Sequence, residues 1–238
     1  MSAAEVVAAL FFAEMRFDPA DPQHPEADRF VLSKGHAAPI LYAAWAAAGA
    51  FPREDLLNLR KITSDLEGHP TPRLPFVDVA TGSLGQGLAA GVGLALNARR
   101  IQSDCRTYVL LGDGETAEGS VWEAAMFAAA QKLERICVVI DYNKWQATAR
   151  SNETLMLAPL VDKWRAFGWD AMEVDGHDVG KLAELMSNVP NGSGKPVAII
   201  AHTVKGKGVS FMEDDNNWHY RAPNTDEVVK AFKELGLS

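Results

Sequence analysis

Two short polar segments, each following an apolar run, contain residues suited to bind a metal ion. Asp113 lies in a Gly-Asp-Gly segment after the run 108–111, and Asn143 follows the run 136–140. Carboxylate and amide oxygens suit Mg²⁺, which leaves its other coordination positions to phosphate and water. Gly112 and Gly114 have no Cβ, so the backbone there can approach a phosphate closely. The pattern predicts a Mg²⁺–diphosphate site; the alternative is two ordinary turns, since Asp-Gly and Tyr-Asn are common in turns.

The segments around these residues predict the elements that position them. The runs 108–111 and 136–140 are short and rich in β-branched or other apolar residues, as buried strands are. A helical segment separates them, which indicates a parallel βαβ unit. Parallel strands place their carboxyl ends at one edge of the sheet, where ligands bind in open α/β folds. We therefore expect Asp113 and Asn143 to lie side by side.

Other parts of the chain continue the alternation of helices and strands. Strands are predicted over residues 169–174 and 196–202, and residues 63–79 are expected to form a loop. The segment Ser2-Ala3-Ala4-Glu5 matches a capping box at the start of the first helix. Helices are predicted to begin at Pro52 and to cover residues 2–15, 39–48, 88–98, 160–167, 179–187 and 225–235.

A stripe of small residues lies on one side of the helix predicted over residues 88–98. Gly87, Gly91 and Ala95 follow one another at intervals of four, so they share a helix face and allow another backbone to come close. A subunit interface and a tight contact within the chain are equally compatible with this spacing.

The composition limits the classes of protein to which the chain can belong. A length of 238 residues fits one large domain or two small ones, and a net charge of -8 argues against a general nucleic-acid or anionic-membrane binder. No uninterrupted apolar run reaches the length of a membrane span. Cys105 and Cys137 lack metal-binding spacing, which favours reduced thiols and a cytoplasmic location.

Several motifs extend together over nearly the whole chain. They are Ser33-Lys34-Gly35-His36, Gly68-His69-Pro70, Thr81-Gly82-Ser83-Leu84-Gly85-Gln86-Gly87, Gly112-Asp113-Gly114-Glu115 with Glu118-Gly119, Asp141-Tyr142-Asn143, Asp175-Gly176-His177 and Trp218-His219. The motifs occur in the order found in transketolase, and the chain resembles the amino-terminal, diphosphate-binding half of that family, as found in transketolases split over two genes. The resemblance implies an α/β fold with a parallel sheet, helices on both faces and one thiamine-diphosphate-binding domain over residues 1–238.

The resemblance also implies a role for individual residues. Asp113, Asn143 and the backbone carbonyl of Trp145 match the protein ligands of Mg²⁺. Glu118 matches an acid in a relay between paired active sites. His36, His69 and His219 match catalytic histidines at the cofactor and substrate, whereas His177 is expected to be structural. The contacts implied for thiamine diphosphate are Lys34, His36, Gly82, Ser83, Leu84, Asp113, Gly114, Asn143 and Lys205.

These residue types suit the reaction of the family. Transketolase transfers a two-carbon ketol unit from a ketose phosphate to an aldose phosphate. A hydroxyl proton leaves when the carbon–carbon bond breaks, and an aldehyde oxygen later gains one. Histidine titrates near neutral pH and can serve both steps. The thiazolium ring of the cofactor acts as the electron sink.

Two departures from the family pattern bear on activity. A Gly-His-Pro-Gly-Gly segment usually precedes the first helix, and the sequence begins at Met1-Ser2 without it. The glutamate that activates the cofactor belongs to a pyrimidine-binding domain, which is expected to be absent, like the C-terminal domain. We therefore expect a C-terminal partner subunit in an α2β2 assembly. The alternatives are a truncated or degenerate domain without activity, and one component of a 2-oxo-acid dehydrogenase type enzyme.

Overall fold

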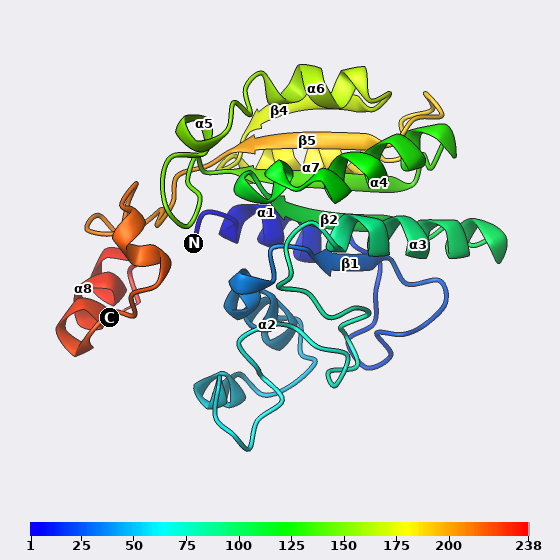
Figure 1. The fold of residues 1–238 in the computed structure, drawn as a ribbon. Coiled ribbons are helices and arrows are strands. Elements are labelled where there is room, and N and C mark those ends of the chain that lie inside the picture. Colours follow the sequence, from blue (N-terminus) through cyan, green and yellow to red (C-terminus); the bar gives the residue numbers. More distant parts are fainter. Residues whose placement is uncertain (238) are drawn as a thin grey trace.

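A five-stranded parallel sheet forms the centre of the molecule. The computed structural model describes residues 1–237, and the strand order is β1-β2-β3-β5-β4, with every neighbouring pair parallel (Figure 1). β2 and β3 are buried along their whole length, as the apolar runs predict. The strands are β1 (Arg29–Leu32), β2 (Thr107–Gly112), β3 (Ile136–Tyr142), β4 (Asp170–Asp175) and β5 (Val197–His202).

Helices cover both faces of the sheet, which confirms the predicted α/β fold class. One apolar core lies under α1 (Ala4–Ala9), α2 (Ala38–Ala47) and α7 (Val179–Ser187). A second core lies on the opposite face, and its helices are α3 (Gly87–Arg100), α4 (Gly119–Ala130) and α6 (Leu160–Ala166). The remaining elements are η1 (Leu10–Glu14), η2 (Gly35–Ala37), η3 (Arg53–Asn58), η4 (Gly114–Ala117), α5 (Ser151–Thr154), η5 (Asn216–His219) and α8 (Thr225–Glu234). Among the helices described, none is both long and apolar enough to cross a membrane.

The first helix differs from its prediction. It begins at Ala4, and it changes at Leu10 into a π-helical turn that ends at Glu14. The predicted capping box is wrong, because the helix has no side-chain cap. The hydroxyl of Ser2 instead donates to Asp141 Oδ2 at 2.7 Å, so a long-range contact replaces the local one. The segment after Pro52 likewise forms the 3₁₀ helix η3, and no α-helix.

The small residues of α3 pack against the sheet. A Cβ at Gly91 would lie 2.5 Å from Cγ2 of Val109 in β2, and one at Gly87 would lie 2.3 Å from Oγ of Ser33. Of the two alternatives for this stripe, the structure therefore supports the tight contact within the chain. The contact brings the segment before α3 close to the ends of β1 and β2.

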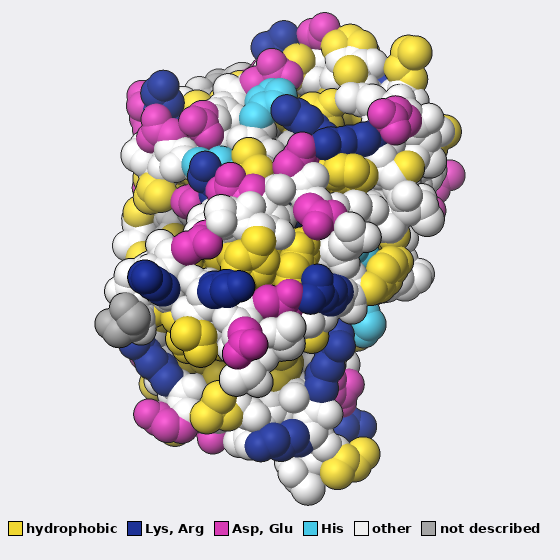
Figure 2. Space-filling view, turned by 90° about the vertical axis from the view of Figure 1, so that its left-hand side faces the viewer, with side chains coloured by type: hydrophobic (Ala, Val, Ile, Leu, Met, Phe, Trp, Pro, Cys, Tyr) yellow, Lys and Arg dark blue, Asp and Glu magenta, His cyan; other side chains and the backbone are white. Residues whose placement is uncertain are grey.

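The carboxyl ends of the strands meet at one edge of the sheet. The loop after β5, η5 and α8 stand beside this edge in Figure 1, close to the amino-terminus. Figure 2 looks onto this side of the molecule, where apolar side chains near the centre are bordered by acidic and basic ones. The residues with predicted roles come from segments at this edge.

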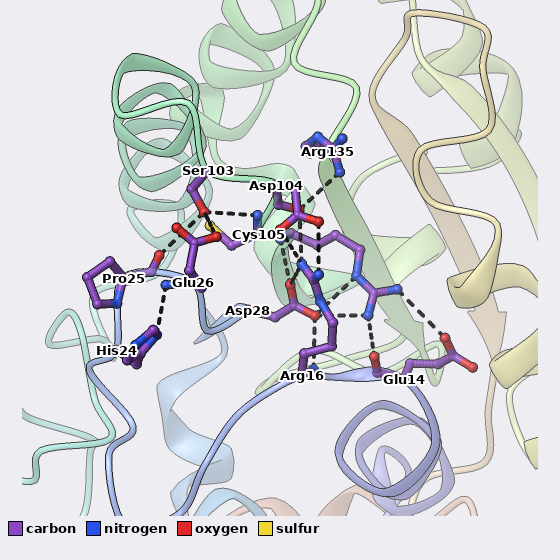
Figure 3. A network of polar contacts seen from close by, with 11 residues as sticks. Glu14, Arg16, His24, Pro25, Glu26, Asp28, Ser103, Asp104, Cys105 and Arg135 are labelled. Carbon is purple, nitrogen blue, oxygen red and sulfur yellow. Dashed lines mark hydrogen bonds and ion pairs between the residues drawn. The ribbon is translucent and has the colours of Figure 1, made fainter.

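A network of polar contacts lies at the opposite edge of the sheet, where the strands begin (Figure 3). The Asp28 side chain is fully buried and pairs with Arg16 and Arg106 at 3.2 and 2.9 Å. Asp104 also pairs with Arg16, at 3.0 Å, but its side chain is 59% exposed. This network joins the segment after η1 to the starts of β1 and β2.

Candidate functional site

Asp113 is the buried carboxylate at the centre of the site. It follows β2, and its Oδ2 accepts hydrogen bonds from Lys144 N at 2.8 Å and Ser151 Oγ at 2.7 Å. Its backbone N–H donates to the carbonyl of Asp141 in β3 at 3.2 Å. Burial raises the pKa of Asp113 to about 6, against the opposing hydrogen bonds from Ser151 and Gly114. A carboxylate desolvated in this way is stabilised by a cation placed beside it.

The turn after β3 lies directly against Asp113, as the strand pattern predicts. Asn143 is buried, and its side-chain oxygen accepts a hydrogen bond from Trp145 N at 3.0 Å. Trp145 then forms an isolated antiparallel bridge with Arg150, which closes a small hairpin. The hydrogen bond from Lys144 to Asp113 holds this hairpin at the end of β2. The two oxygen-bearing segments are thus neighbours in space.

Asp141 contacts several segments of the site, although no role was predicted for it from the sequence. Its Oδ2 lies 2.5 Å from Lys34 Nζ and accepts a hydrogen bond from Ser2, while its Oδ1 accepts one from Thr203. Burial alone would raise the pKa of Asp141, but the Lys34 ammonium and the hydrogen bonds outweigh burial and lower it. One carboxylate therefore joins the ends of β1, β3 and β5 to the start of the chain.

Glu115 is a second residue whose part the sequence did not reveal. Its Oε1 accepts hydrogen bonds from Ser33 Oγ at 2.5 Å and from Gly85 N at 2.9 Å. Its Oε2 accepts one from Gly112 N at 3.2 Å. Glu115 thereby ties the turn at residues 82–87 to the ends of β1 and β2. The Gly-Asp-Gly-Glu sequence contained the residue, but no local pattern indicated its partners.

Two lysines supply positive charge beside the carboxylates. Lys34 follows β1 and Lys205 follows β5, so they reach the site from different strands. The pKa of Lys205 is lowered by partial burial and then by the charge of Lys34. Two ammonium groups that repel each other in a partly buried site are stabilised when an anion lies between them. This arrangement suits a diphosphate.

The three histidines with expected catalytic roles come from segments at the same edge. The rings of His36 and His69 lie edge to face with centroids 4.6 Å apart. A Cβ at Gly82, whose φ is +129°, would lie 2.5 Å from Cδ2 of His69, so only glycine fits there. His219 Nδ1 lies 3.1 Å from Lys205 Nζ. Burial, followed by the charge of Lys205 and then that of His36, lowers the pKa of His219 to about 4.

The other predicted residues line the surface of this edge or support it. Ser83, Leu84 and Glu118 are exposed. A Cβ at Gly114 would lie 2.9 Å from Cγ of Gln146, so a larger residue there would displace that side chain. His177 makes contacts within the chain: its Nε2 accepts a hydrogen bond from Val204 N at 2.9 Å, and its Nδ1 lies 3.2 Å from Glu5.

The residues present fit a diphosphate with a divalent cation. Asp113 and Asn143 offer hard oxygen ligands, and the destabilised carboxylate favours a cation. Lys34 and Lys205 favour the anion that such a cation would accompany. Asp113, Asn143 and Trp145 would hold the metal, and Lys34, His36, Gly82, Ser83, Leu84, Gly114 and Lys205 remain the predicted contacts of the cofactor.

Comparison with known proteins identifies the family. The family model described as transketolase, thiamine diphosphate binding domain, matches residues 1–238. The chain belongs to the transketolase family. It is 50% identical over 243 residues to a transketolase-like protein 2 from Bos taurus, with 98% of this chain covered. It is 40% identical over 235 residues to an apulose-4-phosphate transketolase subunit of Phocaeicola vulgatus, and the match covers 99% of this chain and 84% of that protein.

Solved transketolase structures share the fold. The transketolase from Leishmania mexicana superposes with a TM-score of 0.92 at 30% identity, over 99% of this chain and 37% of that one. The transketolase from Campylobacter jejuni gives a TM-score of 0.91 at 29% identity, over the whole of this chain and 38% of that one. The chain also spans 38% of the length of the Bos taurus relative. It therefore corresponds to the thiamine-diphosphate-binding domain of the family.

Proposed function

We propose that the chain is the thiamine-diphosphate- and Mg²⁺-binding subunit of a transketolase. The proposal rests on one observation: Asp113 contacts the turn Asn143–Trp145, beside the ammonium groups of Lys34 and Lys205. Asp113, Asn143 and the Trp145 carbonyl hold the metal, and the two lysines neutralise the diphosphate. Bound thiamine diphosphate supplies the electron sink for breaking a carbon–carbon bond next to a ketone.

The histidines handle protons in the proposed ketol transfer. His69 and His219 face the sugar phosphate in this proposal, and the ring of His36 packs against that of His69. The lowered pKa of His219 keeps its imidazole neutral at physiological pH. This pKa lies below the near-neutral titration expected of a histidine, so His219 is a weak base that accepts a hydroxyl proton only transiently when the ketose is cleaved and readily returns it to the aldehyde oxygen of the acceptor.

A partner that carries the pyrimidine-binding domain completes the proposed enzyme, in an α2β2 assembly. The Phocaeicola vulgatus relative supports this organisation, because it is named as one subunit of a transketolase and this chain covers 84% of it. Glu118 is exposed at the start of α4, where it is free to contact another chain. Free, buried Cys105 and Cys137 are compatible with the cytoplasmic location that we propose.

Calorimetric titration of thiamine diphosphate into the chain, with and without Mg²⁺, tests the cofactor site. We expect binding that depends on Mg²⁺ and that the substitution Asp113→Asn abolishes. Asp162→Asn, on the exposed surface of α6, is the control and should bind as the wild type does. Binding that is independent of Mg²⁺, or unaffected by Asp113→Asn, would contradict the proposal.

A further inference from the structure

We propose that Asp214 is a positioning residue, which fixes the metal-binding turn against the loop that carries Lys205 and His219. This inference rests on the proposed function, since it concerns the same metal site. Glu213, Asp214 and Asp215 form an acidic run in the loop after β5. The structure gives Asp214 contacts that its two neighbours lack.

The side chain of Asp214 holds both strands of the hairpin that follows Asn143. Its Oδ1 and Oδ2 accept hydrogen bonds from the two terminal nitrogens of Arg150, each at 2.6 Å. Its Oδ1 also accepts a hydrogen bond from the indole nitrogen of Trp145 at 2.8 Å. The Arg150 guanidinium lies over the Trp145 ring, 3.8 Å from the centroid. Two parallel hydrogen bonds and a stacked ring give this pair a fixed geometry that a single surface ion pair lacks.

The backbone of Asp214 fixes the other side of the contact. Its N–H donates to the carbonyl of Lys205 at 2.9 Å, and its φ of +55° is a left-handed conformation. Asn216, two residues on, donates from its side chain to the carbonyl of Ala147 at 3.1 Å. Asp214 thus contacts the Lys205 loop through its backbone and the hairpin of residues 145–150 through its side chain.

Both ends of the hairpin lead to the proposed metal ligands. Trp145 carries the carbonyl proposed as a ligand, and its N–H donates to the Asn143 side chain. Arg150 precedes Ser151, whose hydroxyl donates to Asp113. Loosening Asp214 therefore affects the orientation of all three proposed ligands. Residues that orient metal ligands typically change metal affinity by about 10- to 100-fold when they are substituted.

The neighbouring acid Asp215 provides a matched control for the charge of Asp214. The side chain of Asp215 accepts hydrogen bonds from the backbone and side-chain nitrogens of Asn217, within its own turn, where it caps η5. Asp215→Asn therefore removes the same charge from the same loop without touching the hairpin. Asp214→Asn keeps the left-handed backbone, which Asn tolerates, and removes the ion pair. Asp214→Gly also tolerates this φ and removes the contact with Trp145 as well.

Calorimetric titration of Mg²⁺ into the full chain, at saturating thiamine diphosphate, measures the effect. We expect about tenfold weaker Mg²⁺ binding for Asp214→Asn and a larger loss for Asp214→Gly. Asp215→Asn should match the wild type. Arg150→Gln should weaken binding as Asp214→Asn does, and the double variant should add little, because both residues act through one contact.

Hydrogen exchange of the Trp145 indole N–H, followed by NMR, reports on the contact without any ligand. Protection in the wild type and its loss in Asp214→Gly are expected. Wild-type Mg²⁺ affinity in Asp214→Gly would overturn the positioning role while leaving the proposed function intact. A wild-type chain with a protected indole but no Mg²⁺ binding would refute the proposed function, and the positioning role with it.

Discussion

Lys205 and His219 form a contact from which the charge can be removed while the hydrogen bond is kept. Lys205 Nζ lies 3.1 Å from His219 Nδ1. Gln in place of Lys205 still carries an N–H₂ donor, but it has no charge. The substitution Lys205→Gln therefore isolates the effect of the ammonium on the histidine. Burial of the imidazole remains as the other cause of its lowered pKa.

The separation of the two nitrogens sets the size of the expected change. Two unit charges 3.1 Å apart repel by roughly 1.3 kcal/mol at the dielectric constant of water. That free energy corresponds to about one pKa unit. Both groups are partly exposed, so the water value is the appropriate one. We expect the pKa of His219 to rise from about 4 to roughly 5 in Lys205→Gln, still below the ordinary value of 6.5.

NMR titration of the histidine ring protons, between about pH 3 and pH 8, measures this value directly. The folded state binds fewer protons than the unfolded state between the two pKa values of His219. Its contribution to stability is therefore fully present above pH 6.5 and is lost as the pH falls toward 4. Titration of His219 near 6.5 in the wild type, or an unchanged pKa in Lys205→Gln, would refute this reasoning.

Three further predictions concern the scaffold. Asp28→Asn should lower the free energy of unfolding, measured in urea titrations, by about 3 kcal/mol, because it leaves two arginine side chains without their buried partner (Figure 3). Asp104→Asn, in the same network, should leave the free energy of unfolding nearly unchanged, because Asp104 is exposed. Gly91→Ala should lower the free energy of unfolding by roughly 1–2 kcal/mol, because the new Cβ would lie 2.5 Å from the Val109 side chain of β2. At Gly93 a Cβ meets open space, so Gly93→Ala should raise the free energy of unfolding by up to about 1 kcal/mol in the same assay. Burial raises the pKa of Cys137 to about 12, so mass spectrometry should detect no alkylation of this thiol in the folded chain at about pH 8; modification at the rate of a free thiol would contradict its burial.

Much of the fold follows from local patterns in the sequence. The apolar runs at β2 and β3 are short, continuous and bounded by turn residues, and both are buried strands. The parallel order then places Asp113 and Asn143 at one edge without further information. The spacing of Gly87 and Gly91 predicts a close approach, but it does not say what approaches. The structure supplies the missing partner, which is the sheet itself.

The contacts that hold the site together could not be predicted from the sequence, because they join residues that are far apart in the chain. Ser2 fits a helix cap by its local pattern, yet its hydroxyl bonds to Asp141, which lies 139 positions away. Asp141 and Glu115 stand inside motifs whose neighbours attract attention, so their own role was missed. Asp214 lies in an acidic run, and its partner Arg150 is 64 positions away in the sequence. Side chains with several remote partners leave no periodic signal.

We propose above that this chain supplies the cofactor site of a two-subunit transketolase. The most direct test is a ketol-transfer assay with xylulose 5-phosphate, ribose 5-phosphate, thiamine diphosphate and Mg²⁺, run on the chain alone and with a pyrimidine-domain subunit. We expect transfer only when both subunits are present, and its loss in Asp113→Asn. Absence of transfer from the folded wild-type chain with its partner would contradict the proposed function.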